Sequence, residues 1–149
     1  MKDQHAVAFT GSRKDMTTIQ AQRLAEVLAD LHMGGVNRIR HGCCKGADRT
    51  AHRLAVGLGF RIGGHPGDQE QSAWAHEPTR LGDFDFIKPV QSYLVRNREM
   101  VDKCGLLIAT PAEMTFVLRS GTWATVRYAS DTGTRTIFVF PDGTKEISS

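Results

Sequence analysis

The stretch HAVAFTGSR, residues 5–13, decides the fold: a run of apolar residues stops abruptly at a Gly-Ser turn. A short apolar run that ends at glycine is typical of a buried strand followed by a turn. From Asp15 onward, apolar residues recur at steps of three and four until Gly34-Gly35, which predicts an amphipathic helix covering one face of a sheet. These apolar residues are Ile19, Leu24, Val27, Leu28 and Leu31.

The same unit of strand, glycine loop and helix then occurs a second time. Residues 36–43 predict a strand, residues 42–46 a glycine loop and residues 47–57 a helix. Further strands are predicted at 60–64, 106–109 and 136–140, and further helices at 92–104 and 121–129. Because α and β elements alternate, we expect a single α/β domain over residues 1–149, with a mainly parallel sheet and helices on both faces.

Residues 67–89 are polar, rich in turn formers and long for a connection within one domain. Such a segment is often a lid or an interface. Its apolar side chains have no evident place in a core, so we expect them to support a homodimer. They are Trp74, Leu81, Phe84, Phe86 and Ile87.

The composition is that of an ordinary globular protein, with 40% hydrophobic and 23% charged residues. The net charge of +3 favours anionic ligands but falls short of the dense basic patches of a dedicated DNA-binding protein. No run of about 18 apolar residues predicts a membrane span, and the first residues lack the apolar stretch of a secretory signal. Of three cysteines, Cys43 and Cys44 are adjacent, which argues against a disulfide framework and for reduced thiols in the cytoplasm.

No grouping of residues has the spacing of a metal site. His52 follows Asp48 by four residues on the same face of the predicted helix, but no further ligand accompanies them and there is no CxxC pair. We therefore expect no metal and no resident cofactor.

Three glycine loops fall where predicted strands end: residues 10–13, 42–46 and 120–122. In an open α/β sheet the ligand lies beyond the carboxyl ends of the strands, so these loops should converge. Glycine lets backbone N–H groups approach a phosphate, and a helix that begins after the loop directs its positive end at the anion. The predicted nucleotide- or phosphate-binding residues are Thr10, Gly11, Ser12, Arg13, Gly42, Cys43, Lys45, Gly46, Asp48, Arg96, Asn97, Ser120, Gly121, Thr122 and Thr125.

Each feature also has a plainer structural interpretation. A strand-to-helix turn commonly needs glycine, and a Ser or Thr there often only caps the helix. Asp48 in a first helical turn complements the helix dipole, and the polar run at residues 96–99 could face solvent. The convergence of three polar loops, two of them with a cation, favours the binding site.

Four segments together resemble the SLOG (SMF/DprA-LOG) superfamily over nearly the whole chain. They are FTGSR at 9–13, HGCCKGADRTAHRLA at 41–55, RNREMVD at 96–102 and SGTWATVRYA at 120–129. The superfamily includes the small YpsA-like proteins, which this chain resembles most in size and opening motif, the DNA-processing protein A family and the LONELY GUY phosphoribohydrolases. The resemblance implies a Rossmann-like fold with a phosphate-binding loop.

The resemblance leaves enzymatic activity open. LONELY GUY enzymes cleave the N-glycosidic bond of nucleoside monophosphates with an arginine and the glutamate of a PGGxGTxxE motif, and here that glutamate falls on Thr125. A carboxylate that stabilises a sugar cation is therefore missing at this point. If the chain is an enzyme, the resemblance leaves Arg98 and Glu99 as its catalytic candidates.

Three functions follow as alternatives. The first is binding of a nucleotide or nucleotide-derived phosphate ligand, in a sensing or sequestering role. The second is a nucleoside-monophosphate N-glycosidase. The third is single-stranded nucleic acid binding, as in the DNA-processing protein A family. The chain has only two Trp and two Tyr, so it offers few aromatic side chains on which bases could stack.

Overall fold

A computed structural model describes residues 2–67 and 70–148 of the chain. Seven strands form one sheet in the order β4-β3-β2-β1-β5-β6-β7. All neighbouring strands pair in parallel except β6 and β7, which are antiparallel. The strands are β1 (Asp3–Gly11), β2 (Arg38–His41), β3 (Arg61–Gly64), β4 (Phe86–Ile87), β5 (Cys104–Thr110), β6 (Arg135–Val139) and β7 (Lys145–Ile147).

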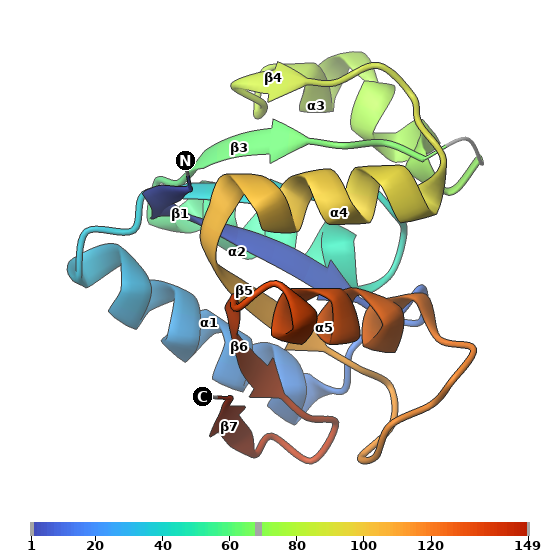
Figure 1. The fold of residues 1–149 in the computed structure, drawn as a ribbon. Helices are drawn as coiled ribbons and strands as arrows, with labels where there is room; N and C mark the ends of the chain where they lie inside the picture. The colour runs from blue at the N-terminus through green and yellow to red at the C-terminus, as the bar shows by residue number, and fades with distance from the viewer. Residues whose placement is uncertain (1, 68–69, 149) are drawn as a thin grey trace.

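Helices cover both faces of this sheet, as Figure 1 shows, and they enclose two apolar clusters. On one face, α1 (Thr18–Met33) and α2 (Ala47–Leu58) pack Leu24, Leu28 and Ala51 against β1 and β2. On the other, α4 (Tyr93–Lys103) and α5 (Gly121–Asp131) contribute Met100 and Ala129. The predicted Rossmann-like α/β architecture, mainly parallel with helices on both faces, is confirmed.

Glycine at two positions allows the first loop to lie close to α2. A Cβ on Gly11 would collide with the side chains of Ala47 and Thr110. Gly46, the residue before α2, has φ 84°, and a Cβ there would meet the carbonyl of Arg13. Only glycine adopts this backbone conformation readily, so the two loops can touch: the Ala47 N–H donates to the Ser12 carbonyl at 3.0 Å.

The segment that we expected to be a long polar loop contains short elements instead. These are the 3-10 helix η1 (Glu70–His76), α3 (Pro78–Leu81) and strand β4. Residues 68 and 69 of this segment lie outside the described residues. This segment is therefore a structured extension that lies beside β3 at one edge of the sheet (Figure 1).

The expectation that Trp74 and Phe84 have no core role is wrong. Trp74 is 7% exposed and packs with Cys43 and Ala75, and Phe84 lies against the same cluster. The rings of His41 and His52 lie within about 6 Å of both aromatic side chains. Leu81 is 47% exposed, and Phe86 and Ile87 are half-buried.

A buried chain of hydrogen bonds ties this segment to the sheet. The Cys43 N–H donates to His41 Nδ1 at 3.0 Å, so the other ring nitrogen of His41 donates to His52 Nδ1 at 3.0 Å. His52 Nε2 in turn donates to the Asp83 carboxylate at 2.9 Å. Burial lowers the pKa of both imidazoles, which keeps them neutral and fixes this order of donors.

None of the helices among residues 2–67 and 70–148 is both long enough and apolar enough to cross a bilayer.

Candidate nucleotide-binding cavity

A cavity of about 570 Å³ opens at the carboxyl ends of β1 and β5. The chain extends the sheet from β1 through β2 and β3 on one side, and from β5 through β6 on the other. Ligands of open α/β sheets bind where the strand order reverses in this way. The volume also lies within the range of small-molecule sites, about 300–1,000 Å³.

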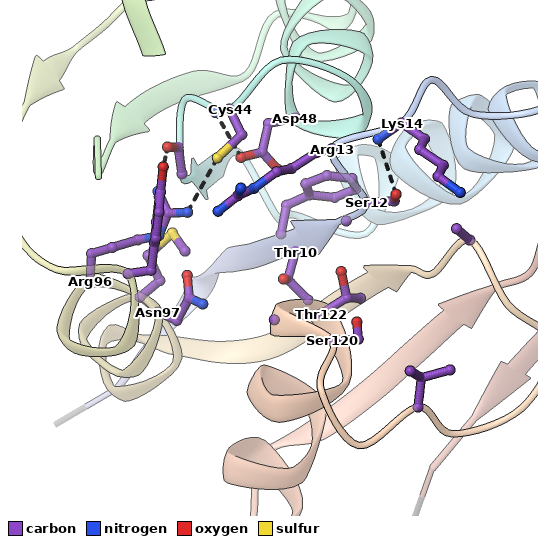
Figure 2. A pocket seen from close by; sticks show the side chains of 18 of the residues that line it. Thr10, Ser12, Arg13, Lys14, Cys44, Asp48, Arg96, Asn97, Ser120 and Thr122 are labelled. Carbon is purple, nitrogen blue, oxygen red and sulfur yellow. Dashed lines mark hydrogen bonds between the residues drawn. The ribbon is translucent and has the colours of Figure 1, made fainter. Parts of the chain in front are cut away.

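Most of the predicted binding residues line this cavity, several of them shown in Figure 2. They are Thr10, Gly11, Ser12, Arg13, Gly42, Asp48, Arg96, Asn97, Ser120, Gly121 and Thr122. The predicted residues that do not line it are Cys43, Lys45, Gly46 and Thr125. Cys43 is a fully buried residue of the second loop, Lys45 is exposed to solvent, and Thr125 lines a different cavity.

Sequence reasoning missed several lining residues, notably Lys14, Tyr93, Glu113 and Arg119. Lys14 could have been found, since it directly follows the predicted loop. Tyr93 starts α4, and its ring lies under two guanidinium groups, with Arg13 at 4.8 Å and Arg96 at 4.6 Å from the ring centre. No sequence pattern pointed to that arrangement.

The first loop presents hydroxyl and cationic groups. The Ser12 hydroxyl accepts the Lys14 N–H at 3.0 Å, which closes a tight turn and leaves the hydroxyl hydrogen able to donate. Arg13 and Lys14 are exposed at the cavity rim. This loop therefore offers positive charge that is not committed to buried partners.

The third loop ends in the N-terminus of α5. The Ser120 hydroxyl caps the helix by accepting the Trp123 N–H at 3.3 Å. The N–H groups of Gly121 and Thr122 precede the helical hydrogen bonds, so they are available to an anion. In Figure 2, Thr10, Thr122 and Ser120, which belong to the first and third loops, are drawn below Cys44 and Asp48.

The second loop, in contrast, already holds a buried carboxylate. Asp48 is 4% exposed and accepts the Cys44 N–H at 3.0 Å. The Gly42 N–H and the Cys44 thiol also stabilise its ionised form. A phosphate at this loop would face the Asp48 carboxylate, and the Gly42 and Cys44 N–H groups that the predicted cradle would use already bind that carboxylate.

Arg96 is also engaged by the protein. Its guanidinium is 6% exposed and donates to the carbonyls of Gly42 and, at 2.8 Å, His65, and to the Cys44 sulfur at 3.3 Å. Together with the Asp48 carboxylate it forms a buried pair of opposite charges around Cys44. Arg96 therefore holds the second loop against α4 with its two terminal nitrogens, and its Nε has no hydrogen-bond partner among the described residues.

The thiols are not nucleophiles here. Burial raises the pKa of both Cys43 and Cys44, and the Asp48 carboxylate adds to the effect. Both therefore remain protonated at neutral pH.

The residues named as catalytic candidates lie away from this cavity. Glu99 pairs with Lys88 at 3.5 Å, and the Arg98 guanidinium lies 5.1 Å from the centre of the Tyr128 ring. Neither lines the cavity, whose two carboxylates are Asp48 and Glu113. Glu113 accepts the Trp123 indole N–H at 3.0 Å.

Burial of Asp48 predicts a specific pH dependence of stability. Its pKa rises from an ordinary value of 3.8 to about 6, mainly because burial penalises the charged form. The lowered pKa values of the buried imidazoles of His41, His52 and His65 make the free energy of unfolding rise with pH over this range. Asp48 acts in the opposite sense, because between pH about 4 and about 6 it binds more protons in the folded state than in the unfolded state, so its own contribution should fall as the pH rises. The loss should be on the order of 2–3 kcal/mol, and Asp48 should add no slope above that range.

Urea unfolding of the wild type and of Asp48→Asn at several pH values measures this effect. We expect the free energy of unfolding to rise more steeply with pH between about 4 and about 6 in Asp48→Asn than in the wild type, because the opposing contribution of Asp48 is gone. The same slope in both proteins would contradict the assignment.

Comparison with known proteins places the fold. No protein-family model and no curated protein matches the sequence. Among solved structures, DNA processing protein A (DprA) from Streptococcus pneumoniae superposes with a TM-score of 0.70 at 22% identity, over 89% of this chain and 49% of that one. DprA from Helicobacter pylori, described by its single-stranded DNA binding mode, gives 0.66 at 19%, over 89% and 64%.

The molybdenum cofactor carrier protein from Chlamydomonas reinhardtii gives a TM-score of 0.63 at 17% identity, covering 91% of this chain and 76% of that one. The chain spans 49% of the S. pneumoniae DprA chain and 64% of the H. pylori one. These likenesses show that the chain shares the fold of the DprA proteins, as the sequence resemblance implied.

Proposed function

We propose that the chain binds a nucleotide or a nucleotide-derived phosphate ligand in the cavity between the β1 and β5 loops. The observation that carries the proposal is the meeting of the first loop with the N-terminus of α5 in one cavity of about 570 Å³. Hydroxyls, exposed cations and backbone N–H groups come together there, which is the donor set that phosphate recognition uses.

Within the cavity, the phosphate belongs on the side of Ser12 and Thr122. Arg13, Lys14 and Arg119 supply positive charge at the rim. The opposite wall carries Asp48, which is ionised above a pH of about 6 and would repel an anion. The sugar and base would then extend toward Asn97 and Tyr93, which line the same cavity.

Binding without turnover fits this site better than glycoside cleavage. A glycosidase needs a carboxylate placed at the anomeric carbon, and the position that the LONELY GUY resemblance assigns to it is Thr125. Thr125 lies outside the cavity, and its hydroxyl donates to the Gly121 carbonyl at 2.9 Å. Asp48 and Glu113 accept hydrogen bonds from the protein itself.

Single-stranded nucleic acid binding is the second candidate, because the H. pylori DprA structure is described by that activity. It would give affinity that grows with oligonucleotide length and falls steeply with salt. The small net charge of +3 favours the nucleotide instead.

Incubation with AMP, CMP, GMP and UMP tests the proposal. We expect at least one monophosphate to be retained by the protein in equilibrium dialysis and recovered intact, with free base released far more slowly than about 1 per second. Absence of retention up to about 1 mM would remove the binding proposal. Release of base at about 1 per second would replace it with a glycosidase, and Glu113→Gln and Asp48→Asn would then identify the carboxylate.

A further inference from the structure

A second cavity of about 290 Å³ adjoins the first along the groove between α4 and α5. Tyr93, Asn97 and Gly121 line both cavities, so the two lie side by side at the N-terminal ends of these helices. From Gly121 to Tyr128 the second cavity follows α5 for about 10 Å, at 1.5 Å per residue. It adds about half the volume of the first cavity to the groove.

The walls of the second cavity combine flat, apolar and cationic groups. Tyr128 presents a ring held in place by its hydroxyl, which donates to Asp102 at 2.7 Å, and the Arg98 guanidinium covers that ring at 5.1 Å. Leu94 is 56% exposed, and Ala124 adds a small apolar surface at the floor. A flat aromatic base suits such walls, because rings and guanidinium planes stack on it.

Charge in this cavity is positive on balance. Arg98 and Arg127 line it, against the single lining carboxylate of Asp131. The Arg127 guanidinium also lies 5.6 Å from the centre of the Phe116 ring, and Phe116 is 52% exposed. These arginines can hold an anionic linkage, while the stronger phosphate site remains at Ser12 and Thr122.

We propose that the ligand consists of two linked nucleotide units, with a phosphate in the first cavity and the second base in the groove between α4 and α5. This inference rests on the proposed function. The first cavity alone is large enough for one nucleotide. The second cavity lies beside the first and has aromatic and cationic walls, which a single nucleotide in the first cavity would leave unoccupied.

Calorimetry with AMP, the 5′-phosphorylated 3′–5′ dinucleotide pApA and the pyrophosphate-linked diadenosine diphosphate tests the inference. We expect at least one dinucleotide to bind about tenfold or more tightly than AMP, and the tighter of the two identifies the linkage. The ratio of dinucleotide to AMP affinity is compared within each variant. This affinity ratio should fall to between about 1 and about 3 in Arg127→Glu. It should stay near the wild-type ratio in Arg53→Glu, which makes the same change of charge at an exposed residue of α2.

The outcomes separate the two proposals. If AMP binds but neither dinucleotide exceeds it by about threefold, the inference fails and the nucleotide site stands. If neither dinucleotide binds and none of AMP, CMP, GMP and UMP binds, the proposed function fails. If an oligoadenylate of twelve nucleotides binds about tenfold more tightly than both dinucleotides, the ligand is a single-stranded nucleic acid and the inference is overturned.

Discussion

Replacing Arg96 by methionine should lower the free energy of unfolding by about 3–5 kcal/mol, the largest effect on stability that we expect from any lining residue of the first cavity. The buried guanidinium donates to the carbonyls of Gly42 and His65, and methionine offers them no donor. Asp48 would also lose its neighbouring positive charge. For a domain whose stability is typically about 5–15 kcal/mol, this is a large share.

Urea unfolding monitored by circular dichroism measures the change. Arg98→Met is the matched control, since Arg98 lies on the same helix two positions away and is exposed. We expect the control to differ from the wild type by about 0.5 kcal/mol or less. Equal stabilities of the Arg96 and Arg98 variants would show that Arg96 does not hold the second loop.

Replacing Gly121 by aspartate should weaken nucleotide binding at least about tenfold while the fold stays intact. Gly121 begins α5, and a Cβ at this position meets nothing within 4 Å, so the new side chain fits. An acidic residue in the first turn is favourable for the helix itself. The loss of affinity would therefore arise from the carboxylate, which would stand where the N–H groups face the phosphate.

Gly121→Asn separates charge from size, because asparagine has nearly the same shape as aspartate without its charge. We expect the asparagine variant to lose much less affinity by calorimetry than the aspartate variant. Unchanged affinity in a folded Gly121→Asp protein would contradict the assignment of the phosphate to the N-terminus of α5.

Strand and helix positions were predictable where the apolar pattern is regular. The strand expected at residues 5–10 is Asp3–Gly11, and the helix expected at 47–57 is Ala47–Leu58. The antiparallel strand β7 was missed, because its three residues are exposed and carry no apolar pattern. The role of Trp74 was missed because its partners, His41 and His52, come from β2 and α2.

The location of the site was predictable from the sequence, whereas the hydrogen bonds of its residues were not. The loops do converge, because the strands are parallel and their carboxyl ends share one edge. The engagement of Arg96 could not be read from the sequence, since its acceptor Gly42 lies 54 residues earlier in the chain. Likewise, the place of Asp48 in the first turn of the predicted helix does not reveal that its carboxylate accepts the Cys44 N–H.

Calorimetric titration of the wild-type protein with each nucleoside monophosphate and with the matching nucleoside tests the central claim most directly. Only the phosphate differs within each pair, so the comparison isolates the contribution of the first loop and the N-terminus of α5. We expect at least one monophosphate to bind about tenfold or more tightly than its nucleoside, a difference of about 1.4 kcal/mol. Equal affinities within every pair, or no binding of any monophosphate, would contradict a phosphate site in this cavity.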